Sequence, residues 1–363
     1  MTGALAAEQA DKLRLIRTPH VGPVAYRQLL LRFGTARAAL EALPDLASRG
    51  GARRFQPADP RLVAQEAARV AALGARYCFV GDADYPPLLA RADSAPPVLI
   101  LRGDVDLAAR RCVAIVGARN ASAAACRFAR ELAHDLARTD IVIVSGLARG
   151  IDTAAHMGAG PGATAAVIGC GIDVVFPPEN AQLQEQIANE ALLMTELPPG
   201  AEPLARHFPA RNRIIAWMTL GTVVVEAAPR SGSLLTARLA GEEGREVMAV
   251  PGFPIDPRAH GCNGLIRDGA TLVQSAQDVL EAIGSIDARV VRSPGIRYAG
   301  EPPADLAPGE REQVLALLSM SAVAVDELVR QSGLAPALVQ TVLLELEIAG
   351  RLQRHAGGRV SLS

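Results

Sequence analysis

From Arg111 onwards the chain alternates short apolar segments with segments of helical periodicity, and this alternation limits the fold more than any other feature of the sequence. Short apolar runs separated by helices indicate strands of a mostly parallel sheet that is covered on both faces. We therefore expect a doubly wound α/β domain over residues 78–290. Its predicted strands are Cys112–Val116, Ile141–Val144, Thr164–Ile168, Leu192–Thr195, Thr222–Val225, Val247–Val250 and Thr271–Val273.

The residues before this domain predict a small helical domain at positions 1–77, of the SAM or helix-hairpin-helix type. Apolar positions between Leu13 and Leu43 recur at helical spacing, and glycine and proline interrupt them at residues 18–23. Two helices joined by such a turn resemble the helix-hairpin-helix motif, which holds a nucleic-acid backbone through the N–H groups of the turn. The motif usually has glycine where His20 stands, and an ordinary helical bundle fits the same pattern.

The end of the chain predicts a proline-rich linker, residues 291–309, and a third domain, residues 310–363. Three helices and a hairpin around Gly357-Gly358 make this domain a winged helix. Its third helix would need base-reading donors to enter a DNA groove, but residues 336–349 contain two glutamates and no arginine or lysine. We expect the domain to contact protein, while arginines near the hairpin leave contact with a DNA backbone open.

Composition excludes several classes of protein. Half of the 363 residues are apolar, so the chain can bury a large core. No apolar run reaches the ~20 residues of a membrane helix and no secretion signal is recognisable, so we expect a cytoplasmic protein without membrane contact. The five cysteines include no C-x-x-C pair, which argues against disulfides and a zinc site. Because the formal net charge is only −1, a polyanion has to be bound by a local patch.

Glycine, serine and arginine gather where the predicted strands end. Right-handed crossovers place these loops along one edge of the sheet, where ligands of such folds bind. Glycine lets a backbone approach phosphate closely, and helix N-termini attract anions, although any single loop of this kind is also ordinary in strand-to-helix turns. We expect the four arginines among these residues to line an anion pocket. The candidates are Gly117, Arg119, Ser145, Gly146, Arg149, Gly150, Gly169, Gly171, Arg211, Asn212, Arg213, Ser231, Gly232 and Ser233, with residues 211–213 in a basic turn.

Candidates for catalysis are weak. Asp152 and His156 lie at i and i+4 of one predicted helix, and Ser231 or Ser233 could act as a nucleophile beside them. The G-x-S-x-G motif is absent, and a serine before a helix is usually its cap. The G-x-G-x-x-G and G-x-x-x-x-G-K-[ST] loops are absent too. We interpret Asp152 and His156 as a structural pair that braces the loop after the second strand, and we expect neither cofactor nor metal nor enzymatic activity.

Between residues 110 and 280 the chain resembles, in unbroken order, the DNA-processing protein A (DprA) family. The resemblance implies an extended Rossmann-like domain that dimerises. It also implies a bacterial protein of natural transformation and DNA recombination that binds and protects incoming single-stranded DNA and helps load the RecA recombinase. Carried over by position, the arginine after the first strand is Arg119 and the basic turn is Arg211 and Arg213, while the glycine loops are Gly117, Ser145–Gly150 and Ser231–Ser233. The matching segments are residues 145–152 (SGLARGID) with His156, 166–173 (AVIGCGID), 196–200 (ELPPG), 208–216 (FPARNRIIA), 225–227 (VEA), 231–237 (SGSLLTA) and 249–252 (AVPG).

Binding a strand without sequence preference needs phosphate contacts and some stacking of bases on aromatic rings. Only 3% of the residues are aromatic, so stacking has to be sparse. Phe208 and Trp217 flank the basic segment and are the candidates, and we expect Trp217 to belong to the core instead.

An alternative interpretation is an enzyme. Gly221-Thr222 followed by Glu226 weakly resembles the PGG-x-G-T-x-x-E loop of the lysine-decarboxylase-like phosphoribohydrolases, which release bases from nucleotides. The PGG is missing and the spacing to the glutamate differs by one residue. A third interpretation is a purely structural interaction module. Base release from AMP would identify the enzyme, and binding of oligo-dT would identify the DNA-binding protein.

Overall fold

The structure, a computed structural model, describes residues 5–292, 309–355 and 357–363. The chain forms two compact units: a core unit, Arg69–Gly295, and a terminal unit, Met1–Ala68 with Ile296–Ser363. The division falls within a helix, α4 (Pro60–Ala72), and before the boundary near residue 77 that the sequence suggests. Residues 293–308 of the predicted linker lie outside the described residues.

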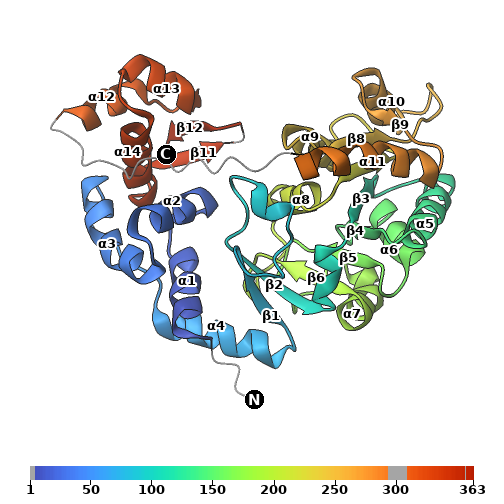
Figure 1. Ribbon diagram of the computed structural model, residues 1–363, viewed down its shortest axis with the longest axis horizontal. Helices are drawn as coiled ribbons and strands as arrows, with labels where there is room; N and C mark the ends of the chain where they lie inside the picture. Colours follow the sequence, from blue (N-terminus) through green and yellow to red (C-terminus); the bar gives the residue numbers. More distant parts are fainter. Residues whose placement is uncertain (1–4, 293–308, 356) are drawn as a thin grey trace. The chain divides into compact units, whose positions relative to one another are not determined.

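A nine-stranded sheet forms the centre of the core unit, in the order β1-β2-β6-β5-β4-β3-β7-β8-β9 (Figure 1). Strands β3 to β9 are parallel, and β2 and β1 extend the sheet antiparallel beyond β6. The predicted parallel strands are all present, within one residue at each end, and the doubly wound fold class is confirmed. The strands are β1 (Arg76–Phe79), β2 (Val98–Gly103), β3 (Cys112–Gly117), β4 (Val142–Ser145), β5 (Thr164–Val167), β6 (Leu192–Thr195), β7 (Gly221–Val225), β8 (Glu246–Ala249) and β9 (Thr271–Leu272).

The strand order reverses between β3 and β7. The chain moves outwards from β3 through β4 and β5 to β6, and then returns to the other side of β3 to continue with β7, β8 and β9. At such a reversal the neighbouring crossovers leave the sheet in opposite directions, so a crevice opens beyond the carboxyl ends of the two strands. The fold therefore provides a ligand position at the ends of β3 and β7.

Helices cover both faces of the sheet (Figure 1). α5 (Ala123–Ala137), α6 (Ile151–Ala159) and α11 (Ala276–Arg292) enclose one apolar core, to which β3 contributes Val113 and Ile115. α8 (His207–Trp217) and α9 (Gly232–Glu242) pack against each other on the opposite side. α7 (Ala181–Glu190) lies against β2 and β6, and α10 (His260–Arg267) lies against β8. None of the helices described is long and apolar enough to cross a membrane.

The terminal unit combines both ends of the chain. Its N-terminal part holds α1, α2, α3 and the first part of α4. Its C-terminal part has the predicted winged-helix arrangement of three helices and a hairpin, with a core that includes Val314, Leu328 and Val342. The elements are α1 (Ala7–Arg17), α2 (Pro23–Phe33), α3 (Ala36–Arg49), α12 (Glu310–Leu317), β10 (Val323–Ala324), α13 (Val325–Ser332), α14 (Pro336–Ile348), β11 (Leu352–His355) and β12 (Arg359–Leu362).

Within the terminal unit, α14 packs directly against α2 and α3. A Cβ atom at Gly50 would lie 2.0 Å from the carbonyl oxygen of Glu345, so the end of α3 touches the backbone of α14. Nη1 of Arg351 donates to the carbonyl of Gly50 at 3.1 Å, and the amides of Gln28 and Gln340 bond at 2.7 Å. The third helix of the winged helix thus contacts protein of its own chain.

Candidate functional site

A groove of about 640 Å³ opens at the carboxyl ends of β3 and β7, where the strand order reverses. Its walls come from the loop after β3, from α8, and from the segment between β7 and the first turn of α9. The topology therefore brings together residues from distant parts of the sequence. The predicted candidates that line the groove are Gly117, Arg119, Arg211, Asn212, Ser231, Gly232 and Ser233.

A smaller pocket of about 210 Å³ shares Arg119, Ala148, Phe208 and Arg211 with this groove. The loops after β4 and β5 complete its wall, which includes the predicted residues Gly146, Arg149 and Gly169. The groove and the pocket together are called the strand-end site.

Two phenylalanine rings give the pocket an apolar wall. The centroids of Phe176 and Phe208 lie 5.5 Å apart, and the rings are tilted by 38° to one another. The guanidinium of Arg119 lies 5.3 Å from the centroid of the Phe208 ring, which is the geometry of a cation–π contact. The pocket thus combines a cation with the faces of two aromatic rings.

Arg211 is a buried cation whose Nε has no hydrogen-bond partner among the described residues. Its residue is 5% exposed, and no described residue accepts a hydrogen bond from its buried Nε. Burial lowers the pKa of Arg211, while the neighbouring Asp152 acts in the opposite direction. Burying a charge without a hydrogen-bonded counter-charge is expensive, on the order of several kcal/mol. Arg211 lines both cavities, so an anion bound there could accept hydrogen bonds from its guanidinium.

Gly146 makes room for this guanidinium. A Cβ atom at residue 146 would lie 1.4 Å from Nη1 of Arg211, so the guanidinium would have to leave its observed position. The loop around it is fixed by Asp152, whose Oδ2 accepts the N–H groups of Gly146 at 3.1 Å and Ala148 at 3.3 Å. Burial raises the pKa of Asp152, and Arg211 opposes that rise. The prediction that Asp152 braces the loop after β4 is confirmed.

His156 serves a different part of the fold. Its Nδ1 lies 2.7 Å from Oγ1 of Thr164, which in turn donates to the carbonyl of Ile143 at 2.9 Å. Burial lowers the pKa of His156 to about 3, so the ring is neutral. His156 therefore ties α6 to β4 and β5, and in the described part of the chain it forms no hydrogen bond with Asp152. The prediction that both residues brace the same loop is wrong for His156.

Gly150 and Gly117 support the site by allowing close packing of backbones. Gly150 has a φ of 77°, and a Cβ atom there would lie 2.3 Å from the carbonyl oxygen of Ala118. A Cβ atom at Gly117 would lie 1.9 Å from the carbonyl oxygen of Val225. Both glycines allow neighbouring backbones to approach closely, and Gly150 lies outside the lining of both cavities.

Ser231 and Ser233 open α9 at the wall of the groove. Oγ of Ser231 accepts the N–H group of Ser233 at 3.4 Å, and the two hydroxyl oxygens lie 2.8 Å apart. The serines therefore cap the helix, and the N-terminus that they cap faces the groove, where the helix dipole favours an anion.

Arg213 does not line the strand-end site, which corrects its predicted place in the anion pocket. It pairs with Glu196, donates to the carbonyl of Ser94 at 3.1 Å and lies 5.6 Å from the ring of Trp217. The physical reason is that residues 211–213 belong to α8 and do not form a turn. Side chains two positions apart on a helix point in different directions, so Arg211 and Arg213 separate.

Ser145 and Gly171 are also absent from the walls of the two cavities. Ser145 is fully buried and donates to the carbonyl of Ile115 at 2.6 Å, while a Cβ atom at Gly171 would meet the backbone of Gly200. Trp217 is 7% exposed and donates to the carbonyl of Leu239 at 3.2 Å, as expected for a core residue.

Phe176 and Arg258 line the site but were missed by the sequence reasoning. Phe176 lies in the loop after β5, which also holds the predicted Gly169 and Gly171, but a single phenylalanine gives no signal of its own for a binding site. Arg258 follows β8, whose carboxyl end lies at the same edge of the sheet, and this position was the available signal.

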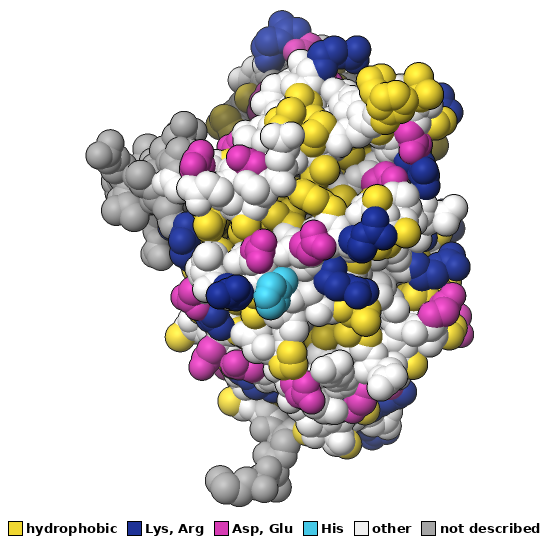
Figure 2. Space-filling view, turned by 90° about the vertical axis from the view of Figure 1, so that its right-hand side faces the viewer, with side chains coloured by type: hydrophobic (Ala, Val, Ile, Leu, Met, Phe, Trp, Pro, Cys, Tyr) yellow, Lys and Arg dark blue, Asp and Glu magenta, His cyan; other side chains and the backbone are white. Residues whose placement is uncertain are grey.

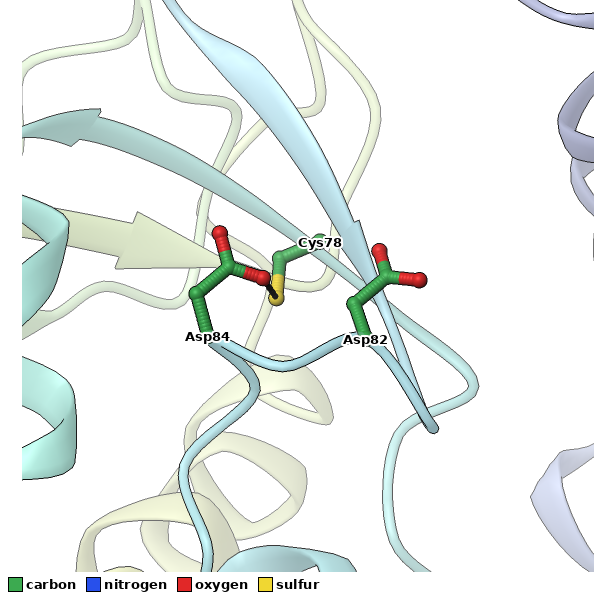
Figure 3. A group of neighbouring side chains, drawn as sticks. All are labelled: Cys78, Asp82 and Asp84. Carbon is green, nitrogen blue, oxygen red and sulfur yellow. Dashed lines mark hydrogen bonds between the residues drawn. The ribbon is translucent and has the colours of Figure 1, made fainter.

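A cluster of Cys78, Asp82 and Asp84 has the composition of a metal site (Figure 3). Asp84 pairs with Arg76 and accepts the thiol of Cys78 at 3.4 Å, and Oδ2 of Asp82 accepts the N–H group of Phe79 at 2.8 Å. Burial, the largest cause, raises the pKa of the Cys78 thiol far above its usual range. The carboxylates therefore fix the turn after β1, and the protonated thiol is a poor metal ligand.

Comparisons with known proteins cover nearly the whole chain. The family model described as DNA recombination-mediator protein A matches residues 76–284. The DprA-like N-terminal HHH domain matches residues 6–68, and the DprA winged helix domain matches residues 299–358.

Three relatives illustrate the similarity. Protein Smf of Synechocystis is 37% identical over 312 residues, which are 77% of this chain and 78% of that protein. The crystal structure of DNA processing protein A from Streptococcus pneumoniae is 38% identical with a TM-score of 0.63, over 76% of this chain and 98% of that one. DNA processing protein A from Helicobacter pylori, whose solved structure concerns its single-stranded DNA binding mode, is 28% identical with a TM-score of 0.53, over 59% and 97% of the two chains. The chain belongs to the DprA family of DNA-processing proteins.

Proposed function

We propose that this chain binds single-stranded DNA at the strand-end site, without sequence preference and without chemical change to the strand. The observation that carries this proposal is Arg211, a buried guanidinium without a hydrogen-bond partner on its Nε at the wall of two open cavities. A phosphate group would supply hydrogen-bond acceptors for the guanidinium and a second negative charge beside that of Asp152.

The remaining lining fits a sugar-phosphate chain. Arg119 lies in both cavities beside Arg211, and Arg149 adds a mostly exposed guanidinium that lies 3.6 Å from Glu179. The N-terminus of α9 offers backbone N–H groups, and the rings of Phe176 and Phe208 offer a surface for base stacking. These groups recognise phosphates and the faces of bases, which supports binding without sequence preference. The single-stranded DNA binding mode of the Helicobacter pylori relative supports single-stranded DNA as the ligand.

The absence of enzymatic activity is part of the proposal. Asp152 accepts two backbone N–H groups, His156 is bonded to Thr164, and the hydroxyl of Ser233 is bonded to that of Ser231. These groups are therefore engaged in the fold and not poised around a substrate. Release of adenine from AMP should accordingly be undetectable with protein that shifts oligo-dT in a gel, and steady turnover would favour the phosphoribohydrolase alternative.

Membership of the family supports a proposal about partners. We propose that the chain works in the cytoplasm as a homodimer formed through its Rossmann-like domain, and that it transfers the bound strand to the RecA recombinase. A mixture of this protein, RecA and oligo-dT coated with single-strand-binding protein tests the transfer. Faster assembly of RecA filaments is expected, and an unchanged rate would contradict this part of the proposal.

Removal of the two site arginines tests the binding itself. Arg119→Ala combined with Arg211→Gln should weaken oligo-dT binding by about a hundredfold at low salt, because two charge-assisted contacts are lost. The slope of log affinity against log salt should fall by about 1.4, the value for two phosphate contacts on a single strand. Arg127→Ala, which removes an exposed arginine on α5 outside both cavities, is the matched control. Unchanged affinity of the folded double variant, checked by circular dichroism, would refute the proposal.

A further inference from the structure

Glu226 has a backbone conformation that residues with a side chain rarely adopt. It follows β7 directly and has a φ of 55°, in the left-handed region. Such a conformation costs about 1–2 kcal/mol for a residue other than glycine, and it persists only where the surroundings determine it. The contacts of Glu226 are therefore a place to look for a function.

The residue holds both ends of the loop that carries Arg119, residues 118–122, here called the Arg119 loop. The carbonyl of Glu226 accepts the N–H group of Ala118 at 2.7 Å. Its carboxylate oxygen Oε2 accepts the N–H group of Ser122 at 2.6 Å. Ser122 caps α5 through its own hydroxyl, so the carboxylate also lies at the N-terminus of that helix, where the helix dipole stabilises a negative charge.

The second carboxylate oxygen faces a cation of the groove. Oε1 of Glu226 lies 3.7 Å from Nε of Arg258, and the Glu226 side chain is 12% exposed. Arg258 also binds Asp256 through Nη2 at 2.9 Å and lines the groove. One glutamate thus connects the segments that follow β3, β7 and β8 at the edge of the sheet.

We propose that Glu226 is a positioning residue, which holds Arg119 in the strand-end site by fixing both ends of the Arg119 loop. The proposal rests on the proposed function for the identity of the ligand. It assigns to Glu226 a role opposite to that of the glutamate in the phosphoribohydrolase-like motif, because a carboxylate bonded to Ser122 and facing Arg258 does not approach a substrate.

A double-mutant cycle on oligo-dT binding tests this role. Glu226→Ala should weaken binding by about tenfold in the otherwise unchanged protein, and by less than about twofold when Arg119 is already alanine. Glu226→Gln should restore most of the affinity, because the amide oxygen can still accept from Ser122. Equal losses in both backgrounds, or a glutamine variant as weak as the alanine variant, would overturn the proposal. Glu242→Ala, which removes a half-exposed carboxylate of α9, controls for the change in net charge.

Hydrogen exchange separates this inference from the proposed function. Exchange of the Ser122 amide should accelerate by at least about tenfold in the Glu226→Ala variant and remain slow in the Glu226→Gln variant, whatever the ligand is. A protein that does not bind oligo-dT but shows this difference would refute only the proposed function. Unchanged exchange at Ser122 in the alanine variant would refute the positioning role.

Discussion

The terminal unit and the strand-end site are both rich in arginine, and they use it differently. The terminal unit, residues 1–68 and 296–363, holds 16 basic and 14 acidic side chains, whereas residues 81–290 hold 18 basic and 24 acidic ones. In the terminal unit Arg17 pairs with Glu66 at 2.9 Å, and Arg14 donates to the carbonyl of Ala58 at 2.8 Å. Buried guanidinium nitrogens without a partner among the described residues occur in both units, at Nη2 of Arg354 and at Nε of Arg211 and Arg245, but of these three arginines only Arg211 lines the strand-end site. The comparison teaches that the local partners of a charge, and not the net charge of a segment, decide where an anion can bind.

The surface in Figure 2 supports the same conclusion. Basic and acidic side chains are interspersed on this face, with no broad area of one sign. A polyanion attracted by this surface as a whole would gain little, since neighbouring charges of opposite sign cancel beyond about 10 Å in ordinary buffers. On this face, binding of a polyanion would therefore have to depend on a local site.

The turn between α1 and α2 of the terminal unit, residues 18–22, lies against other residues of the same unit. A Cβ atom at Gly350 would lie 2.9 Å from the ring of His20, and one at Gly22 would lie 3.7 Å from Oε1 of Glu347. Burial raises the pKa of Glu347, and Arg354 acts in the opposite direction. The turn between α1 and α2 thus lies against the end of the winged helix, whereas the strand-end site is open.

The largest expected effect is a loss of stability in the terminal unit that leaves the affinity of the strand-end site for DNA unchanged. Gly50→Val places a branched side chain against the carbonyl of Glu345 and should lower the free energy of unfolding by roughly 3 kcal/mol. Urea titration measures the loss, and Gly284→Ala, at a helical glycine with open space around it, is the control. Affinity for oligo-dT should change by less than about twofold, so a tenfold loss would show that the two regions are not independent.

Gly146→Ala is the converse experiment in the core unit. A Cβ atom 1.4 Å from Nη1 of Arg211 has to displace the guanidinium, so oligo-dT affinity should fall by about thirtyfold. Fluorescence anisotropy of labelled oligo-dT measures the change, and Gly264→Ala, where a Cβ atom meets nothing, serves for comparison. Affinity equal to that of the unaltered protein would mean that Arg211 is not the anion-binding group.

The smallest expected effect concerns pH. The pKa of His156 is lowered from 6.5 to about 3 by burial, so below pH 6.5 the unfolded chain binds a proton that the folded chain does not. The stabilising effect of the neutral ring is complete above pH 6.5 and is lost as the pH falls towards 3. The raised pKa of Asp152 changes stability with pH in the opposite sense. Asp152 is present both in the unaltered protein and in the His156→Gln variant with which it is compared below, so its effect cancels.

Between pH 6 and pH 5 the unaltered protein should therefore lose about 1 kcal/mol more stability than the His156→Gln variant. Urea titration at the two pH values measures this difference. Equal losses would show that the ring takes up a proton in the folded protein.

Much of the core unit could be predicted from sequence because its signals are local. Parallel strands buried on both faces leave apolar runs, and the glycines and serines after them mark the edge where ligands bind. The separation of Arg211 from Arg213 could not be predicted, because it depends on the segment being helical. The hydrogen bond between Glu226 and Ser122 joins residues that are 104 positions apart, and no local sequence pattern around either residue predicts it.

The packing of the two ends of the chain into one unit could not be predicted from the sequence, for the same reason. Arg351 reaches the carbonyl of Gly50 across 301 positions, and local patterns indicate only two separate helical domains. Pattern reading identifies elements, while their long-range partners are set by packing.

That union also has a consequence during synthesis on the ribosome. α3 ends at Arg49, and α14 begins only at Pro336, close to the end of the chain. At the usual pace of translation, the first helices wait roughly 15 to 60 s before the helix that covers Gly50 has been made. The newborn N-terminal segment thus leaves the ribosome before α14 is available to cover Gly50.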